Sequence, residues 1–415
     1  MNRNTSITRR AFIWNTVSGM VNAGQSALIL IFISHYLTHT DAGVFTIAFA
    51  LANLFSTMGR YGVRNYQVTD VQENNRFAEY LRARVYTVAA SLGAMLIYVG
   101  VQTLRGIYTP GKTGVIAIIC LWKTIDAVED VYYGMYQQKG RLDIGAKCYS
   151  LRLIASTVVF CVLLALHASL LTASVLSAVV SIAFASMLVR KTIPTFQLPR
   201  QAVRREAVGK ILRVCLPLFI GTTLSIFVGN SPKYMIDWYM DESTQAIFGY
   251  IMMPAFVIMV LNQIIYQPII RGLGELWQNG SRKQFVRRVL LQYLVVMGVT
   301  VLVILGGYVA GIPLLSLMYN VDLGPYKLEF IVLLLGGGIY ALVNFIMVPL
   351  TAMRFQNCVP FGFAGAAVLS VALGSVIVPA RGLLGAAGLY LVLNLRLAVY
   401  LTACFLIRCM KIKDR

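Results

Sequence analysis

The sequence has 415 residues, of which 58% are hydrophobic and 13% are charged, and its mean hydropathy is +0.73. Soluble domains carry about 25% charged residues, so this composition excludes a soluble enzyme or binding module. The net charge of +20 lies in short segments between apolar runs, where anionic lipid headgroups account for it. We therefore expect anionic membrane lipids as partners and no nucleic acid.

Apolar runs that are long enough to cross a membrane recur along the whole chain. About 18 apolar residues suffice for a transmembrane helix. The first run continues to Ser34 without a small-residue cleavage site, so we interpret it as a retained span and not as a signal peptide. The sequence predicts an all-α polytopic membrane protein with twelve spans, near 11–34, 43–59, 83–104, 114–138, 146–167, 169–189, 212–232, 245–270, 287–309, 328–351, 358–379 and 383–407.

The basic residues are concentrated in every second connection between the predicted spans. If the N-terminus is cytoplasmic, 28 of the 36 Lys and Arg residues lie in inner segments, five lie in outer segments, and Lys123, Arg152 and Arg396 lie within spans. Lys and Arg are retained on the cytoplasmic side of membranes. We therefore expect both termini to be cytoplasmic.

The chain repeats itself at half its length. The stretch HYLTHTDAGVF (35–45) aligns without gaps with WYMDESTQAIF (238–248), and each leaves one span and enters the next. This repeat predicts two six-helix bundles, 1–190 and 211–415, joined by a basic cytoplasmic linker at 191–210. Such parallel repeats suit a transporter whose substrate site lies between two rocking bundles.

Motifs typical of soluble enzymes have no suitable context here. GIYTPGKT (106–113) matches the P-loop pattern, but it follows a span on the outer face, so we interpret the match as coincidental. His35 and His39 beside Asp41 lack the further ligands that a zinc site needs. We expect no catalytic residue, no metal and no cofactor. The glycines at 336–338 indicate close helix packing.

The fourth span carries four ionisable residues on one face. At about 100° per residue, Lys123, Asp126, Glu129 and Asp130 fall in a sector of roughly 120°. A charge at the bilayer centre costs at least about 2.5–3.5 kcal/mol, so this face should point into protein or water. Two interpretations follow: an internal ion-pair network that only ties helices together, or the wall of a hydrated cavity.

Other cations lie within or beside the spans. Several cations in an apolar membrane favour an anionic ligand, and a planar guanidinium suits phosphate. The candidate substrate-binding residues are Arg152, Lys233, Arg396, Lys123, Arg60 and Arg64. Arg60 and Arg64 have a simpler alternative role as positive-inside anchors. The neighbouring carboxylates Asp126, Glu129 and Asp130 are candidates for coupling transport to an ion gradient.

Three stretches carry a family resemblance: DAGVFTIAFALANLFSTMGRYGVRNYQVTD (41–70), EDVYYGMYQQKGRLDIG (129–145) and NSPKYMIDWYM (230–240). With twelve spans in two halves, the chain resembles the Wzx-type flippases, the polysaccharide-transport branch of the multidrug/oligosaccharidyl-lipid/polysaccharide (MOP) exporters. The resemblance implies that an undecaprenyl-diphosphate-linked oligosaccharide crosses the bacterial cytoplasmic membrane by alternating access, without ATP hydrolysis.

The same resemblance implies roles for particular residues. The diphosphate would be held in a cation-lined cavity by Arg152, Lys233 and Arg396, with Arg60 and Arg64 as further candidates. Coupling to H⁺ or Na⁺ would fall to one of the three carboxylates of the fourth span. The implied partners are the lipid-linked oligosaccharide and polysaccharide-assembly proteins, and we expect a monomer.

Three alternatives are weighed against this interpretation. A MATE-type multidrug exporter shares the twelve-span plan, but export of cations favours an acidic cavity with few Arg residues. A lipid II flippase of the same superfamily carries two additional C-terminal spans. An integral-membrane glycan polymerase or ligase needs a sizeable outer loop, whereas the longest outer connection, near 310–327, holds Asp322 as its only acid.

Overall fold

The structure is a computed structural model that describes residues 3–70, 72–196, 202–266 and 269–411. Within these ranges every regular element is a helix, and none is a strand, which confirms the predicted all-α class. Nine helical stretches of the described residues are long and apolar enough to cross a membrane. Long helices also lie at the other predicted spans: α5 (Pro110–Gln138), α9 (Glu242–Tyr266) and the second half of α14 (Cys358–Lys411).

The chain divides into two compact units, Met1–Ile226 and Phe227–Arg415. The division falls inside α8 (Arg205–Tyr239), whereas the boundaries predicted at 190 and 211 rest on the repeat alone. Part of the predicted linker, 197–201, lies outside the described residues. The rest comprises the last two residues of α7, the 3₁₀ turn η1 (Ile193–Phe196), residues 202–204 and the first residues of α8, 205–210.

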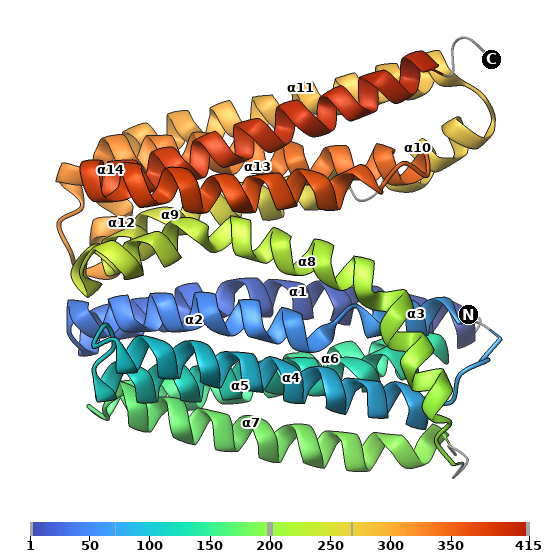
Figure 1. Cartoon of the computed structure of the whole chain (residues 1–415), viewed down its shortest axis with the longest axis horizontal. Coiled ribbons are helices and arrows are strands. Elements are labelled where there is room, and N and C mark those ends of the chain that lie inside the picture. The colour runs from blue at the N-terminus through green and yellow to red at the C-terminus, as the bar shows by residue number, and fades with distance from the viewer. Residues whose placement is uncertain (1–2, 71, 197–201, 267–268, 412–415) are drawn as a thin grey trace. The chain divides into compact units, whose positions relative to one another are not determined.

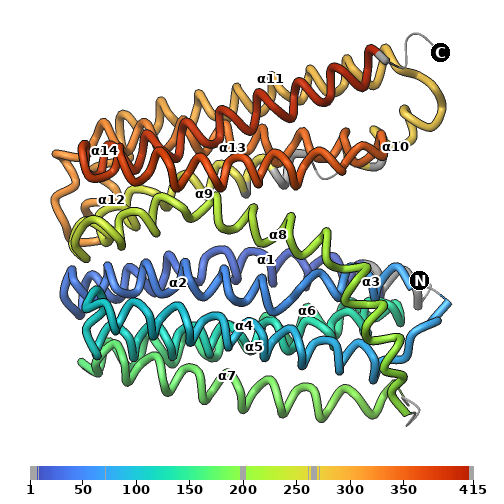
Figure 2. The backbone as a smooth tube through the Cα atoms, viewed as in Figure 1, coloured from blue at the N-terminus to red at the C-terminus, as the bar shows by residue number. Residues whose placement is uncertain are grey.

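The N-terminal unit is built around α5. This helix packs against α2 (His39–Arg60), α4 (Phe77–Leu104), α6 (Leu142–Ala165) and α7 (Leu170–Thr192), while α1 (Arg3–Tyr36) packs on α6 (Figures 1 and 2). The buried Trp122 of α5 stacks on Phe160 of α6, with ring centroids 5.7 Å apart. The helix that carries the ionisable residues is therefore the central one of its unit.

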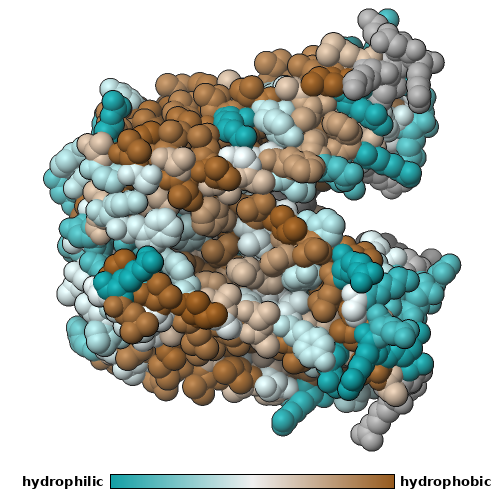
Figure 3. Space-filling view, in the orientation of Figure 1, coloured by the Kyte–Doolittle hydropathy of each residue, from teal (hydrophilic) through white to brown (hydrophobic). Residues whose placement is uncertain are grey.

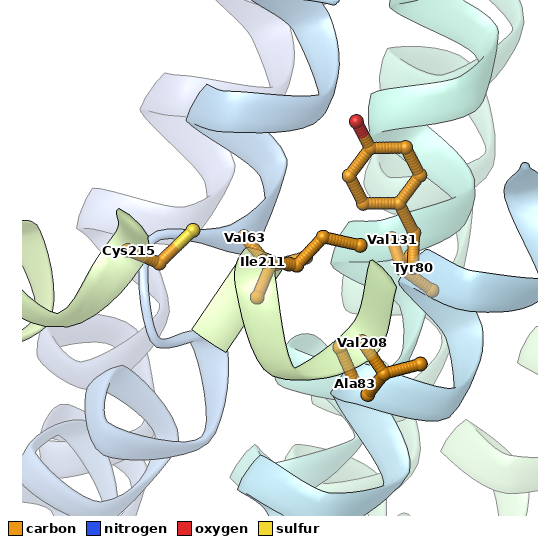
Figure 4. Close-up of a cluster of buried hydrophobic side chains, with 7 residues drawn as sticks. All are labelled: Val63, Tyr80, Ala83, Val131, Val208, Ile211 and Cys215. Carbon is orange, nitrogen blue, oxygen red and sulfur yellow. The ribbon is translucent and has the colours of Figure 1, made fainter. Parts of the chain in front are cut away.

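The first half of α8 is part of this unit. Seven buried residues join it to α4, α5 and the short helix α3 (Val63–Thr69): Val63, Tyr80, Ala83, Val131, Val208, Ile211 and Cys215 (Figure 4). The turn before α4 is fixed by Asp70, whose carboxylate accepts hydrogen bonds from the backbone N–H groups of Asn74 and Asn75, both at 3.0 Å. Burial alone would raise the pKa of Asp70, but these hydrogen bonds and one from Tyr80 lower it below its usual value.

The C-terminal unit is built around α13 (Lys327–Ala352). Its other elements are the second half of α8, α9, the short α10 (Ile269–Gln278), α11 (Arg282–Gly306), the π-helical turn η2 (Gly307–Gly311), α12 (Ile312–Tyr319), η3 (Gly324–Tyr326) and α14. The glycines at 336–338 face three different helices: a Cβ on Gly336 would meet Tyr390, one on Gly337 would meet Ala255 and one on Gly338 would meet Thr300. The predicted close packing is confirmed.

α14 contains two of the predicted spans, 358–379 and 383–407. Its helical backbone is interrupted at Gly382, where φ is 57° and ψ is −135°. An L-residue with a side chain rarely adopts this conformation, whereas glycine does so without a steric penalty. The break falls between the two predicted spans.

The internal repeat is visible in the helix caps. Thr38 Oγ1 accepts a hydrogen bond from the Asp41 N–H (3.2 Å) at the start of α2, and Asp241 Oδ1 accepts one from the Thr244 N–H (2.9 Å) at the start of α9. Both cap residues and both donors are related by the sequence offset of the aligned stretches. Each following span leads into a short helix, α3 or α10. The two halves thus share local structure as well as hydropathy.

The P-loop-like stretch forms the turn between α4 and α5. Gly106 has φ of 74°, Thr109 is the N-cap residue of α5, and Pro110 occupies the first helical turn. Two helices flank the turn, and a phosphate-binding P-loop requires a strand before it. The interpretation of a coincidental match is confirmed.

Exposed apolar side chains cover the flanks of the helices. Leu294 and Leu302 of α11 are 70% and 69% exposed, and Leu96 and Ile97 of α4 are 62% and 70% exposed. Figure 3 shows hydrophobic residues along the helices and hydrophilic residues gathered near helix ends. Such extensive apolar exposure is a liability in water but is expected of a surface that faces lipid.

Candidate functional site

The ionisable face of α5 points into the N-terminal unit. Lys123, Asp126 and Glu129 are only 2–3% exposed, and Asp130 is partly buried. On the opposite side of the helix Val128 is 41% exposed. The prediction that the charged face avoids lipid is therefore confirmed.

Asp126 is the centre of the ion pairs. Its Oδ2 atom lies 2.9 Å from Lys123 Nζ and 3.6 Å from Arg60 Nη2, and its Oδ1 atom pairs with Arg152 Nη2. Lys123 Nζ also donates a hydrogen bond to Gln25 Oε1 of α1, at 3.2 Å. One carboxylate therefore binds cations from α2, α5 and α6.

Asp130, one helical turn further, binds two more cations. Arg84 Nη2 of α4 lies 2.7 Å from Asp130 Oδ2, and Arg64 Nη1 of α3 lies 3.5 Å from Oδ1. Arg84 Nη1 also donates to the Gly59 carbonyl (2.7 Å), and Arg64 Nη2 donates to Gln137 Oε1 (2.9 Å). The end of α2 and all of α3 are thus fixed to α5 by guanidinium groups.

Glu129 has the sparsest set of partners. Its one ion pair among the described residues is with Arg152, whose Nε lies 2.6 Å from Glu129 Oε2. The buried hydroxyl of Tyr133, one turn along α5, interacts with the same carboxylate. Arg152 itself is completely buried, and its Nη1 donates to Ser181 Oγ of α7 at 2.7 Å.

These eight residues form what we call the cation-rich cluster: Arg60, Arg64, Arg84, Lys123, Asp126, Glu129, Asp130 and Arg152. Five cations face three carboxylates, so two positive charges are formally in excess. The three most buried cations equal the three carboxylates in number, so the excess belongs to the two more exposed cations, which can accept an anionic ligand. The side chains of Arg60 and Arg64 are 39% and 29% exposed, whereas those of Arg84, Lys123 and Arg152 are at most 4% exposed. The accessible edge of the cluster therefore lies where α2 ends and α3 begins.

The other two candidate cations belong to the C-terminal unit. Lys233 of α8 is 7% exposed, its Nζ lies 5.6 Å from the centroid of the Phe256 ring, and it has no ion pair among the described residues. Arg396 of α14 donates from Nη1 to the Gly362 carbonyl (3.0 Å), and a Cβ on Gly365 would collide with its guanidinium. Arg396 thus packs into a notch on the first half of α14, and Arg152 and Lys123 lie in the other unit.

Sequence reasoning missed Arg84. The predicted span begins at 83, which places Arg84 at its inner edge among the cations of the connection, whereas α4 begins at Phe77. Glu79 at the third helical position accepts a hydrogen bond from the Arg76 N–H (2.9 Å). An acidic residue at this position is a signal of a helix start, and it could have placed Arg84 two turns inside the helix.

Comparison with known proteins identifies the family. A family described as polysaccharide biosynthesis protein matches residues 8–270, which is more than half of the chain. None of the curated protein sequences matches significantly.

Three solved structures share the fold. The lipid II flippase MurJ in an inward closed conformation is 12% identical with a TM-score of 0.75, over 96% of this chain and 90% of that one. An inward-facing multidrug resistance MATE family transporter of the MOP superfamily is 14% identical with a TM-score of 0.63, over 97% and 98%. A mutant of the Vibrio cholerae MATE transporter VcmN is 12% identical with a TM-score of 0.64, over 99% and 98%. The chain therefore belongs to the polysaccharide biosynthesis protein family, and it has the fold of these MATE transporter and MurJ flippase structures.

Proposed function

We propose that this protein is a flippase that moves an undecaprenyl-diphosphate-linked oligosaccharide across the bacterial cytoplasmic membrane by alternating access. The observation that carries the proposal is the excess of positive charge in the cation-rich cluster. A diphosphate diester is a dianion at neutral pH, so its charge matches this excess, and guanidinium groups bind phosphate oxygens in a planar, bidentate manner. Membership in a polysaccharide biosynthesis family supports the glycan part of the substrate.

The two ends of the cluster have different tasks in this proposal. Arg60 and Arg64 are partly exposed and contact the diphosphate. Arg84, Lys123 and Arg152 are buried against carboxylates, so they set the local charge and hold the helices without contacting the ligand. Lys233 is a buried cation in the C-terminal unit without an ion pair among the described residues, and it supplies a second contact for an anionic group.

We assign the coupling to an ion gradient to Glu129. Among the described residues, Asp126 pairs with three cations and Asp130 with two, whereas Glu129 pairs only with Arg152. A carboxylate with few cationic partners loses least when it is protonated. The buried Tyr133 hydroxyl lies on the same face of α5 and interacts with the Glu129 carboxylate, so it is a suitable partner for a protonated carboxyl group.

A MATE-type exporter of cations is the alternative that the fold allows. Such a protein needs carboxylates that are open to a cationic drug. In the N-terminal unit Asp126 and Glu129 are enclosed by Lys and Arg side chains, which repel a cationic ligand. The charge of the cluster therefore favours an anionic substrate.

The test is export of glycan in a bacterium that lacks its own flippase for the same lipid-linked oligosaccharide. We expect the wild-type protein to restore surface polysaccharide, and we expect Arg60→Ala combined with Arg64→Ala, or Lys233→Ala alone, to abolish it while the protein remains in the membrane. Arg141→Ala is the matched control, because Arg141 pairs with Asp143 at 2.9 Å outside the cluster. Normal export by both the double variant and the Lys233 variant would overturn the proposal.

A further inference from the structure

A groove in the N-terminal unit lies between α4 and the first half of α8, beside the end of α2. Its volume is about 280 Å³, and its walls include Met58, Tyr61, Tyr86, Ala90, Leu212 and Phe219. The wall from α4 is open to the surroundings, since Tyr86 is 51% exposed and Ala90 is exposed. Tyr61 lies in the turn after α2, and the other wall residues belong to helices that are long and apolar enough to cross a membrane, so we expect the groove to open toward lipid.

The groove is apolar because the hydroxyl groups of α4 are occupied elsewhere. Thr87 Oγ1 donates to the Gly59 carbonyl (2.8 Å), and Ser91 Oγ donates to the Phe55 carbonyl (2.5 Å). Both hydroxyls therefore bond to the backbone of α2 and leave methyl, methylene and aromatic surfaces to line the groove. A satisfied polar group does not attract water or a polar ligand.

Two contacts fix the position of α8 along this groove. The Tyr61 and Phe219 rings are stacked, with centroids 4.3 Å apart and an interplanar angle of 17°. At Gly62 the chain approaches α8 so closely that a Cβ would lie 2.7 Å from Leu218 Cδ2, and φ of 70° there also favours glycine. Nearer the start of α8, Val208 and Ile211 pack in the buried cluster of Figure 4. The groove is therefore a fixed feature between these anchors.

The charges beside the groove indicate what occupies it. Tyr61 lies between Arg60 and Arg64 in the sequence, and these two are the exposed members of a cluster with excess positive charge. The wall residue Tyr61 directly follows Arg60 in the chain, and in the proposed function Arg60 and Arg64 contact the diphosphate. A ligand with an apolar tail and an anionic headgroup matches both features.

We propose that this groove binds the isoprenoid chain of the lipid-linked substrate while its diphosphate contacts Arg60 and Arg64. This inference rests on the proposed function and adds a binding site for the lipid part of the substrate. The aromatic walls at Tyr61, Tyr86 and Phe219 offer large, rigid apolar surfaces. The chain would enter the groove from lipid and not from water, so its binding depends on close packing against these walls.

The experiment uses the purified full-length protein in phosphatidylcholine vesicles and an isoprenyl diphosphate that carries a benzophenone on its chain. We expect photolabelling of peptides from α4 and the first half of α8. Ala90→Phe fills the groove and should reduce this labelling several-fold. Ala89→Phe is the matched control, because Ala89 is the neighbouring exposed residue of α4 and does not line the groove. Tyr86→Ala removes one wall from an exposed position, and it should reduce labelling even if the larger side chain at position 90 impairs folding.

A second probe tests whether the groove prefers the isoprenoid chain of the substrate to the acyl chain of an ordinary membrane lipid. A phosphatidylglycerol that carries benzophenone on an acyl chain should label these peptides weakly and without dependence on Ala90. Equal labelling by the two probes would show that the groove holds ordinary membrane lipid, and this would overturn the inference. Equal labelling of the Ala90→Phe and Ala89→Phe proteins by the isoprenyl probe would also overturn it.

Glycan export separates this inference from the proposed function. If the wild-type protein restores export and Ala90→Phe exports normally, the groove is not a substrate site although the function stands. If the wild-type protein does not restore export, the proposed function fails, and the photolabelling pattern still decides whether the groove binds an isoprenyl diphosphate. Loss of export in Ala90→Phe but not in Ala89→Phe supports both.

Discussion

Arg152 differs from a ligand-binding cation in its surroundings. It is completely buried, and it is the only cation paired with Glu129 among the described residues. Removing one partner of a buried ion pair costs about 3–5 kcal/mol, because the other charge is left without compensation. We therefore expect Arg152→Met to lower the free energy of unfolding in detergent by this amount. A loss of export in this variant would then reflect folding and not ligand binding.

Two further variants sharpen this prediction. The double variant Arg152→Met with Glu129→Gln should recover part of the lost stability, because it removes the uncompensated charge together with its partner. Arg141→Ala should cost less than about 1 kcal/mol, because the Arg141–Asp143 pair is partly exposed. An Arg152→Met protein as stable as the wild type would contradict the description of Arg152 as a structural cation.

The sequence predicts which residues share one face of a helix, but it does not predict which residues of other helices contact that face. The charged face of α5 follows from helical periodicity, because the angle between two side chains depends only on their separation along the chain. The partners of that face, such as Arg84 from α4 and Gln25 from α1, depend on how neighbouring helices are shifted along α5. That shift is set by packing, which a hydropathy pattern does not record.

At the scale of elements, the glycines of α13 make a prediction about helix packing. A Cβ on Gly337 would lie 2.8 Å from Ala255 Cβ and 3.0 Å from its Cα, so α9 would have to move. We expect Gly337→Ala to lower the thermal unfolding temperature. Gly298→Ala in α11 is the control, since nothing lies within 4 Å of its Cβ position, and the lower backbone entropy of alanine should leave stability unchanged or raised. Equal effects of the two substitutions would contradict this account of the packing.

Hydropathy predicts the starts of some helices too late. α4 begins at Phe77 and not at 83, and α8 begins at Arg205 and not at 212. The first turns of both helices carry charged residues, among them Glu79, Arg82 and Glu206, so the apolar runs begin later than the helices. The break in α14 was placed correctly because Gly382 interrupts the helix between two apolar runs.

At the scale of the whole molecule, the two units share a repeated local structure but differ in the charges of their central helices. The same cap occurs at the start of α2 and of α9, and each unit has one central helix, α5 or α13. The central helix of the N-terminal unit carries a cluster of opposite charges, whereas that of the C-terminal unit carries glycines. This asymmetry supports the proposal that a charge-dependent step of transport takes place in the N-terminal unit.

Transport coupled to an ion gradient gives the last prediction. If Glu129 takes up the proton, Glu129→Gln fixes the neutral form of the side chain and its shape is retained. In proteoliposomes, the wild-type protein should move a fluorescent isoprenyl-diphosphate glycan faster when a pH gradient is imposed, and Glu129→Gln should move it at the same rate with and without the gradient. Glu73→Gln is the matched control, because Glu73 pairs with Lys139 at a partly exposed position outside the cluster. A Glu129→Gln protein that still responds to the gradient, beside an Asp126→Asn or Asp130→Asn protein that does not, would move the coupling site to the other carboxylate.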